Sequence, residues 1–225
     1  MSVILQIETA TTVCSVALAK DGNVLAVKEM NERNVHAEKI TLFIQDVLQQ
    51  AKHTLADIAA VAVSKGPGSY TGLRIGVSAA KGLCFALDKP LIAINTLDAM
   101  AAGALVFNDQ FSADAILCPM IDARRMEVYT ALYDSDALPV KPTSAKIIDE
   151  NSFADVRDHQ LVIFGDGALK CKDVLINHNV LWLSDFENSA TQLTAIALQK
   201  YQNGAFEDIA YFEPYYLKEF ITTAR

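Results

Sequence analysis

A short pattern occurs twice in this sequence: an apolar strand ends in a carboxylate, a turn follows, and a second apolar strand returns. Ile7-Glu8 and Ala17-Leu18 in the first copy correspond, at a constant offset, to Ile121-Asp122 and Ala131-Leu132 in the second. Four matched positions can arise by chance, but they are also what two lobes descended from one unit would show. We therefore predict a chain of two related lobes.

Strand and helix patterns alternate in the first half of the chain. The expected strands cover residues 2–8, 13–20, 24–30, 58–64 and 91–95, and the expected helices cover residues 34–51, 69–87 and 96–105. This alternation favours an α/β fold with parallel pairing in the sheet. Asn34, Ser69 and Thr96 are the expected N-caps, because their side-chain oxygens can accept a hydrogen bond from a free helical amide.

The second half of the chain is less regular. Its expected strands cover residues 161–164 and 180–183, and its expected helices cover Asp166 to Ile176 and Ser189 to Gln202. We expect the helix over 189–202 to bridge the lobes and the aromatic tail Tyr211–Leu217 to pack down. The polar break at residues 108–110 divides the lobes, so the predicted domains are residues 1–107 and 108–225.

Composition limits the classes of partner and compartment. The formal net charge is −8, and nucleic-acid affinity comes mainly from Lys and Arg neutralising phosphates. Tight RNA binding by the chain alone is therefore not expected, although a basic partner or a small local basic patch could bring it to RNA.

The four cysteines lie far apart without a CxxC pair, which favours free thiols in the cytoplasm. The apolar segment 70–87 is too short and too charged to cross a bilayer, and no signal peptide or membrane anchor is expected.

The most distinctive stretch is KGPGSYTGLRIG, residues 65–76. A Gly-rich turn between a strand and a helix can bind phosphate, but a P-loop requires GxxxxGK[ST], and no Lys stands at that spacing. Gly72, Gly76 and Ala80 recur every four residues, and each helical Gly costs roughly 1 kcal/mol relative to Ala. Close packing against a neighbour would offset this cost, and the neighbour is either internal or another subunit.

Four stretches of the sequence are informative together: KGPGSYTGLRIG, the following AKGL, IDARRMEVY at residues 121–129 and PYYLK at residues 214–218. They resemble the TsaB (YeaZ) family of bacterial tRNA threonylcarbamoyladenosine biosynthesis proteins, and the resemblance extends over essentially the full chain. The resemblance implies the actin-like ATPase (ASKHA) superfold. It also implies a non-catalytic subunit that binds the catalytic paralogue TsaD and, through it, the ATPase TsaE. Their complex transfers a threonylcarbamoyl group from threonylcarbamoyl-adenylate to the adenosine beside the anticodon of tRNAs that read ANN codons. A homodimer is expected for the isolated chain, with tRNA bound only through the complex.

The resemblance also indicates where a nucleotide site would lie. Actin-like ATPases bind phosphates with two carboxylate-led hairpins and bind adenosine with a Gly-Gly segment. Ala10, the Ala123-Arg124 pair and Asp166 here stand where glycine would let the backbone approach the ligand. The remnants of the site are Glu8, Thr9, Thr11, Asp122, Gly165 and Gly167. We expect no competent ATPase site and no cofactor in the isolated chain, while a nucleotide at a subunit junction remains open.

A metal site is not expected either. TsaD-type sequences carry an HxxxH pair after the strand that follows the Gly-rich helix, and Thr96 and Met100 occupy those positions here. Neither side chain replaces a neutral imidazole as a ligand for a hard metal. The four histidines at positions 36, 53, 159 and 178 include no i, i+4 pair.

The expected partner surface lies on the helices over 34–51 and 69–87, because interfaces between subunits are built on apolar and small residues. The candidate contact residues are His36, Ile40, Phe43, Ile44, Val47, Gly72, Leu73, Gly76, Ala80 and Leu83. The alternative hypothesis is an actin-like ATP-dependent phosphotransferase or metallohydrolase with its own active site. Turnover of ATP or tight metal retention by the purified chain would favour that alternative.

Overall fold

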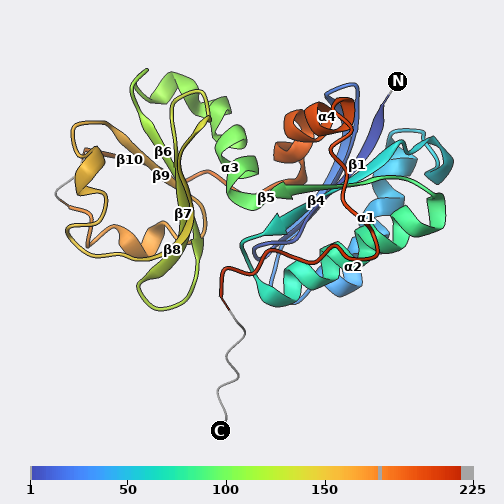
Figure 1. The fold of residues 1–225 in the computed structure, drawn as a ribbon, viewed down its shortest axis with the longest axis horizontal. Coiled ribbons are helices and arrows are strands. Elements are labelled where there is room, and N and C mark those ends of the chain that lie inside the picture. The colour runs from blue at the N-terminus through green and yellow to red at the C-terminus, as the bar shows by residue number, and fades with distance from the viewer. Residues whose placement is uncertain (1, 177–178, 219–225) are drawn as a thin grey trace, which may run out of the picture.

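The computed structural model describes residues 2–176 and 179–218, and these form two lobes side by side (Figure 1). His178 lies outside the described residues. The first sheet has the order β3-β2-β1-β4-β5, and its strands are β1 (Val3–Glu8), β2 (Val13–Lys20), β3 (Asn23–Asn31), β4 (Ala60–Gly66) and β5 (Leu91–Asn95). The second sheet has the order β8-β7-β6-β9-β10, and its strands are β6 (Ile116–Asp122), β7 (Glu127–Tyr133), β8 (Pro139–Ile147), β9 (Leu161–Phe164) and β10 (Val180–Leu183).

The two sheets share one topology. In each, the first strand in the sequence is central, pairs antiparallel with the second strand and pairs parallel with the fourth. The repeat predicted from the sequence is therefore a structural duplication, and the α/β actin-like arrangement is confirmed. The duplication places Glu8 and Asp122 at equivalent positions, because each is the last residue of the first strand of its sheet.

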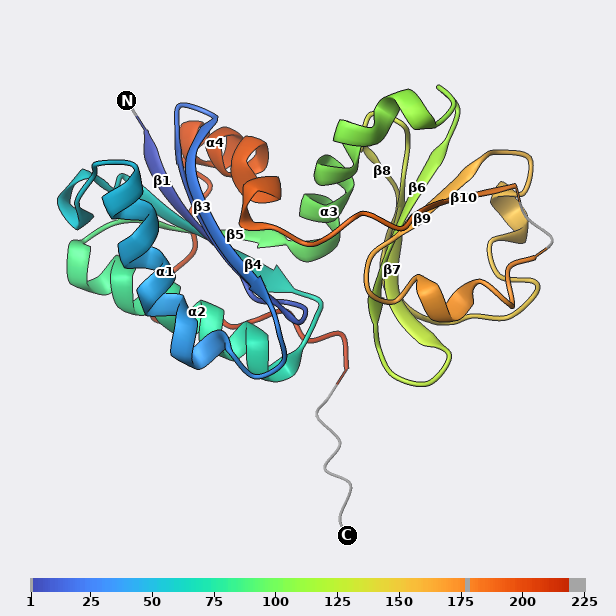
Figure 2. The same ribbon diagram turned by 180° about the vertical axis from the view of Figure 1, so that it is seen from behind.

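Helices cover the sheets unequally. The longer helices are α1 (His36–Gln50), α2 (Tyr70–Leu87), α3 (Thr96–Ala104) and α4 (Thr194–Gln202), and the short 3-10 helices are η1 (Leu55–Asp57), η2 (Leu105–Gln110), η3 (Ala154–Val156), η4 (Leu169–Cys171) and η5 (Ala190–Leu193). The apolar stripes of α1 and α2 pack on one face of the first sheet, and α4 packs on the other face. Figure 2 shows this three-layered lobe from behind. Within the described residues, no helix combines the length and hydropathy that a bilayer crossing requires.

The two cores do not divide at the predicted boundary of residues 107 and 108. Helix α3 lies between the lobes, and most of its buried side chains, including Leu97 and Met100, join the core of the second sheet. The chain then returns, so that η5 and α4 complete the first lobe, with Leu193 and Ala197 in its core. The helix expected to bridge the lobes over 189–202 is thus a 3-10 turn followed by α4, packed on the first sheet.

Three local predictions are corrected by the structure. Helix α1 begins at His36 after Val35, while Asn34 precedes the cap with a left-handed φ of 65°. Asn95, and not Thr96, caps α3, because its side chain accepts a hydrogen bond from the Leu97 amide. The helix predicted from Asp166 to Ile176 is reduced to the single turn η4. The predicted cap at Ser69 is confirmed by the hydrogen bond from Gly72 N to Ser69 Oγ, 3.2 Å long.

Candidate functional site

The Gly-rich start of α2 packs against the turn that joins β1 to β2. A Cβ atom added at Gly68 would overlap Ala10, and one added at Gly72 or Gly76 would overlap Thr9. The Ser69 amide also donates to the Ala10 carbonyl at 2.6 Å. The neighbour that compensates for these glycines is therefore internal, and the turn between β1 and β2 is fixed against α2.

Glu8 begins this turn and is almost completely buried, with 1% of its surface exposed. Its Oε1 accepts a hydrogen bond from the Ala10 amide at 2.6 Å. Burial raises the pKa of Glu8 to about 7; the hydrogen bond from Ala10 opposes this shift, and the charge of Asp166 on the second lobe adds to it. At neutral pH the carboxyl group is thus partly protonated. Its hydrogen-bond partner is the Ala10 amide of the same turn.

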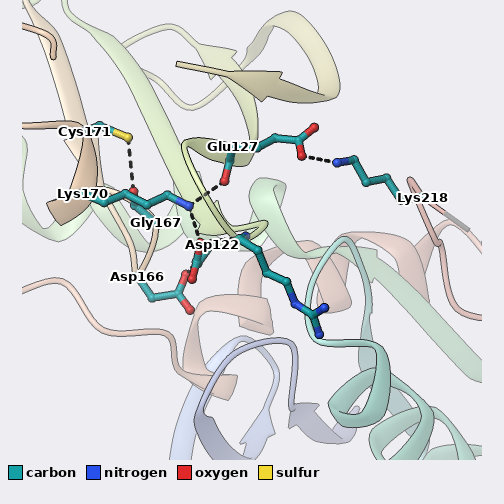
Figure 3. Close-up of polar contacts among 8 residues, drawn as sticks. Asp122, Glu127, Asp166, Gly167, Lys170, Cys171 and Lys218 are labelled. Carbon is teal, nitrogen blue, oxygen red and sulfur yellow. Dashed lines mark hydrogen bonds and ion pairs between the residues drawn. The ribbon is translucent and has the colours of Figure 1, made fainter. Parts of the chain in front are cut away.

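On the second lobe, Lys170 neutralises the equivalent carboxylate (Figure 3). Its ammonium group forms an ion pair with Asp122 and donates to the Glu127 carbonyl at 2.7 Å. The Asp122 amide donates to Asp166 Oδ1, and the Arg124 amide donates to Asp122 Oδ1, both at 2.9 Å. The acidic groups of this lobe are therefore held by donors from the chain itself.

The Gly-rich segment around residues 165–167 lies against the end of β6. Gly165 has a φ of 99°, and a Cβ atom there would overlap the Met120 carbonyl. A Cβ atom at Gly167 would stand 2.8 Å from the carbonyl carbon of Ile121. Both glycines are thus explained by close approach of two backbones, and the segment lies beside Asp122.

The described remnants fall into two groups, one in each lobe. Glu8, Thr9 and Thr11 belong to the turn against α2, and the electrostatic influence of Asp166 on Glu8 links this turn to the second lobe. Thr96 and Met100, at the positions of the missing imidazoles, are fully buried between the lobes. Sequence reasoning missed Lys170; its spacing of four residues from Asp166 was the available signal, but the pairing with Asp122 depends on the fold.

The cysteine thiols are poor nucleophiles. All four are buried, and burial raises the pKa of Cys14 and Cys84 to about 11 and that of Cys118 to about 12. Burial also raises the pKa of Cys171. Since the thiolate is the reactive form, these groups are protonated and unreactive near neutral pH.

The predicted partner residues lie mostly inside the chain. Nine of the ten are buried; they are His36, Ile40, Phe43, Ile44, Val47, Gly72, Leu73, Gly76 and Ala80. Leu83 is half-buried and packs at the edge of the same core. The assignment of the nine to a partner surface is wrong in this conformation, because the amphipathic stripe that revealed them is the stripe that covers their own sheet.

The outer surface of α2 has a different character. Phe85 is 82% exposed, and a Cβ atom added at the exposed Gly82 would have no neighbour within 4 Å. Ser78, Gly82 and Ala86 are exposed small residues spaced four apart. On the adjacent α1, Leu42 is also exposed. This surface, here called the outer helix face, has no packing role within the described chain that explains its glycine.

Comparisons with known proteins place the chain in a family. The family model TsaD, described as tRNA N6-adenosine threonylcarbamoyltransferase, matches residues 27–218. The tRNA threonylcarbamoyladenosine biosynthesis protein TsaB of Escherichia coli is 37% identical, with 96% of this chain and 94% of that protein aligned. This chain belongs to the TsaB family.

Other relatives agree with this assignment. The protein of the same name from Bacillus subtilis is 35% identical over 58% of this chain and 54% of its own length. The solved structure of YeaZ from Pseudomonas aeruginosa superposes with a TM-score of 0.82 at 25% identity, covering 96% of this chain and all of that one. The TsaB resemblance inferred from the Gly-rich motif is therefore confirmed over the length of the chain.

Proposed function

We propose that this chain is the non-catalytic partner subunit of a tRNA threonylcarbamoyladenosine-forming complex. In that role it binds a TsaD-type catalytic subunit and, through it, a TsaE-type ATPase, and so supports threonylcarbamoyl transfer to the adenosine beside the anticodon of ANN-reading tRNAs. The names of its relatives support the pathway. The engaged carboxylates and protonated thiols support a non-catalytic role, because none of these groups is an activated nucleophile.

The observation that carries the proposal is the outer helix face. A helical glycine costs roughly 1 kcal/mol relative to Ala, and Gly82 has no internal neighbour to explain that cost. A largely exposed Phe beside small residues is typical of a surface that another helix approaches closely. A paralogue with an equivalent helix pair can add its own helices there, and a second copy of this chain can do the same when the catalytic subunit is absent.

The test compares two glycines of α2. Gly82→Leu should leave the melting temperature unchanged or raised, since nothing lies within 4 Å of the added Cβ atom and Leu is a better helix former. The same variant should no longer elute with the TsaD-type subunit in size-exclusion chromatography. Gly82→Ala is the matched control and should keep the association, because it adds only a methyl group.

Gly76→Leu should instead lower stability, because its side chain would collide with Thr9. Overpacking of this kind costs typically 1–3 kcal/mol. If Gly82→Leu associates as the natural chain does, the outer helix face is not the docking surface. If the purified chain alone hydrolyses ATP with a divalent metal, the non-catalytic role is overturned in favour of an actin-like phosphotransferase or metallohydrolase.

A further inference from the structure

The C-terminal tail gathers basic and aromatic side chains on one side of the seam between the lobes. The Tyr215 amide donates to the Lys65 carbonyl at 2.7 Å, which fixes the tail beside the Gly-rich turn. The next residue, Tyr216, stacks on Tyr70 with ring centroids 4.9 Å apart. Arg74 lies over the Tyr70 ring at 4.3 Å and donates to the Tyr216 hydroxyl at 3.3 Å.

The same tail then reaches the second lobe, where Lys218 forms an ion pair with Glu127 (Figure 3). Tyr129 lies close to this contact: burial raises its pKa, Glu127 adds to the shift, and Lys218 and Arg124 oppose it. The tail thus connects the first-lobe group around Tyr216 with the second-lobe group around Tyr129, because Tyr216 and Lys218 are only two residues apart. Together they form one surface, here called the tail-side patch.

The tail-side patch is basic although the chain is acidic. Its cations are Lys65, Arg74, Arg124, Arg125 and Lys218, and its aromatic residues are Tyr70, Tyr129, Tyr215 and Tyr216. The carboxylates near these groups are Glu213, Glu127, which is paired with Lys218, and Asp166, which accepts from the Asp122 amide. The nearby Asp122 is already paired with Lys170. An excess of positive charge on a chain with a net charge of −8 marks a site that favours an anionic partner.

The backbone of the β6–β7 turn supports a functional role for this surface. Arg124 and Arg125 are consecutive, exposed and left-handed, with φ values of 69° and 47°. Residues other than Gly, Asn and Asp rarely adopt this conformation, and backbone strain of this kind gathers at functional sites. This backbone conformation places two consecutive arginines in the β6–β7 turn, at the edge of the tail-side patch.

We propose that the tail-side patch binds a single-stranded RNA loop. Guanidinium and ammonium groups contact phosphates, and partly exposed tyrosine rings offer faces on which unpaired bases stack. Tyr215, which is 39% exposed, is the most exposed of the four tyrosines of the patch. The substrate class rests on the proposed role in tRNA modification, because an anticodon loop is the unpaired RNA beside the modified adenosine. Of the five cations, Lys218 is already paired with Glu127, so the patch adds affinity to a complex and gives only weak binding by itself.

The experiment uses the purified full chain without partners, so its result does not depend on association with a TsaD-type subunit. Fluorescence anisotropy at low salt compares a tRNA anticodon stem-loop with a blunt RNA duplex of equal length. We expect the stem-loop to bind more tightly than the duplex. The double variant Arg124→Ala, Arg125→Ala should reduce the slope of log K against log salt by about 1.4, at ~0.7 for each single-strand phosphate contact.

Matched variants separate the contributions. Arg33→Ala with Arg157→Ala removes two exposed arginines elsewhere and should leave binding unchanged. Tyr215→Ala should weaken stem-loop binding roughly 5- to 150-fold, whereas Tyr215→Phe keeps the ring and should bind as the natural chain does.

Equal affinity for stem-loop and duplex, or an equal loss in the Arg33 and Arg157 control, would overturn the proposal. Binding of poly-glutamate in preference to the stem-loop would overturn it as well and would identify the patch as a protein interface. If the chain binds the stem-loop but never associates with the TsaD-type subunit, the proposed function fails and the RNA site stands. The reverse result removes the RNA site alone.

Discussion

At the scale of single residues, Glu8 is a buried acid whose pKa is raised to about 7 by its burial. Its carboxyl group is enclosed by its own lobe, with the Ala10 amide as its hydrogen-bond donor. A carboxylate in such a place resists ionisation. The folded state therefore holds a proton at Glu8 that the unfolded chain has already released above a pH of about 4.5.

This difference predicts a pH dependence of folding. Between the unfolded pKa of 4.5 and the folded pKa of about 7, the folded state binds more protons, so the free energy of unfolding falls as the pH rises. Ionisation of Glu8 lowers the free energy of unfolding by roughly 3 kcal/mol between pH 4.5 and 7. Glu8→Gln keeps an oxygen that can accept from Ala10 and cannot ionise.

Urea denaturation at pH 5 and pH 8 tests this dependence. The natural chain should lose more stability across that range than Glu8→Gln, since the other titrating groups are common to both. Parallel curves for the two proteins would show that Glu8 does not ionise between these conditions.

At the scale of secondary structure, the tail behaves as an extended segment that docks on α2. Lys81 in the middle of α2 donates to the carbonyls of Ala210 and Phe212, at 3.4 and 2.8 Å. Glu207 forms an antiparallel bridge with Leu91 at the edge of the first sheet. One lysine thus holds the part of the tail that leads to the tail-side patch.

Lys81→Met keeps the aliphatic stem and removes the donor, so it should speed amide hydrogen exchange in residues 210–217 with little change in the core strands. Weakly held segments open locally without global unfolding. Lys39→Met on α1, where the lysine pairs with neighbouring Glu38, is the control and should leave exchange in the tail unchanged. Unchanged exchange in the Lys81 variant would mean that the aromatic contacts and the backbone bonds at Glu207 and Tyr215 hold the tail without the lysine.

The elements differ in how well the sequence predicts them. Strands β2, β5, β9 and β10 and helix α2 follow from apolar runs with turn or cap residues at their ends, and the structure places them within about one residue of the expected bounds. The segment from Asp166 to Ile176 is predicted as a helix, but the structure forms only the turn η4 there. Leu169 and Ile176 instead face solvent, and Gly167 must lie against the β6 backbone, which depends on contacts that no local pattern records.

The same limit applies to the site. The equivalence of Glu8 and Asp122 is predictable from the sequence repeat, and the structure places both at the end of the first strand of their sheet. The side chains predicted to face a partner are buried against their own sheet, because a small or apolar stripe shows that packing occurs but does not show against what. Lys170 and the left-handed arginines depend on long-range pairing and backbone geometry.

At the scale of the whole molecule, polar contacts among the described residues connect the two lobes in two places. Tyr133 donates to Asp98 at 2.7 Å and Asn95 donates to Thr143 at 3.0 Å near α3. On the tail side, the ion pair between Lys218 and Glu127 connects them. An exposed ion pair of this kind contributes at most about 1 kcal/mol, so it can limit lobe motion without determining stability.

Lys218→Met with Glu127→Gln should therefore leave the melting temperature nearly unchanged and broaden the distribution of distances between the lobes. Single-molecule energy transfer can measure the distribution of distances between dyes attached at Gln49→Cys and Asp158→Cys, which are exposed positions in different lobes. The native thiols are buried, so the dyes attach at the introduced cysteines. Lys170→Met is not a suitable control, because it removes the ion-pair partner of Asp122. Lys141→Met is the suitable control, because it removes an exposed ion pair that lies within the second lobe. An unchanged distribution would assign control of the lobe angle to α3 alone.

The return of the chain to its first lobe also fixes an order of events during synthesis. Residues 97–186 supply the second core as one uninterrupted segment, whereas the first core lacks Leu193 and Ala197 until the end of the chain has been made. Domains usually fold as units while the chain emerges from the ribosome. The lobe that is translated first is therefore the last to be completed, and until then the bare α4 side of its sheet is exposed to chaperones.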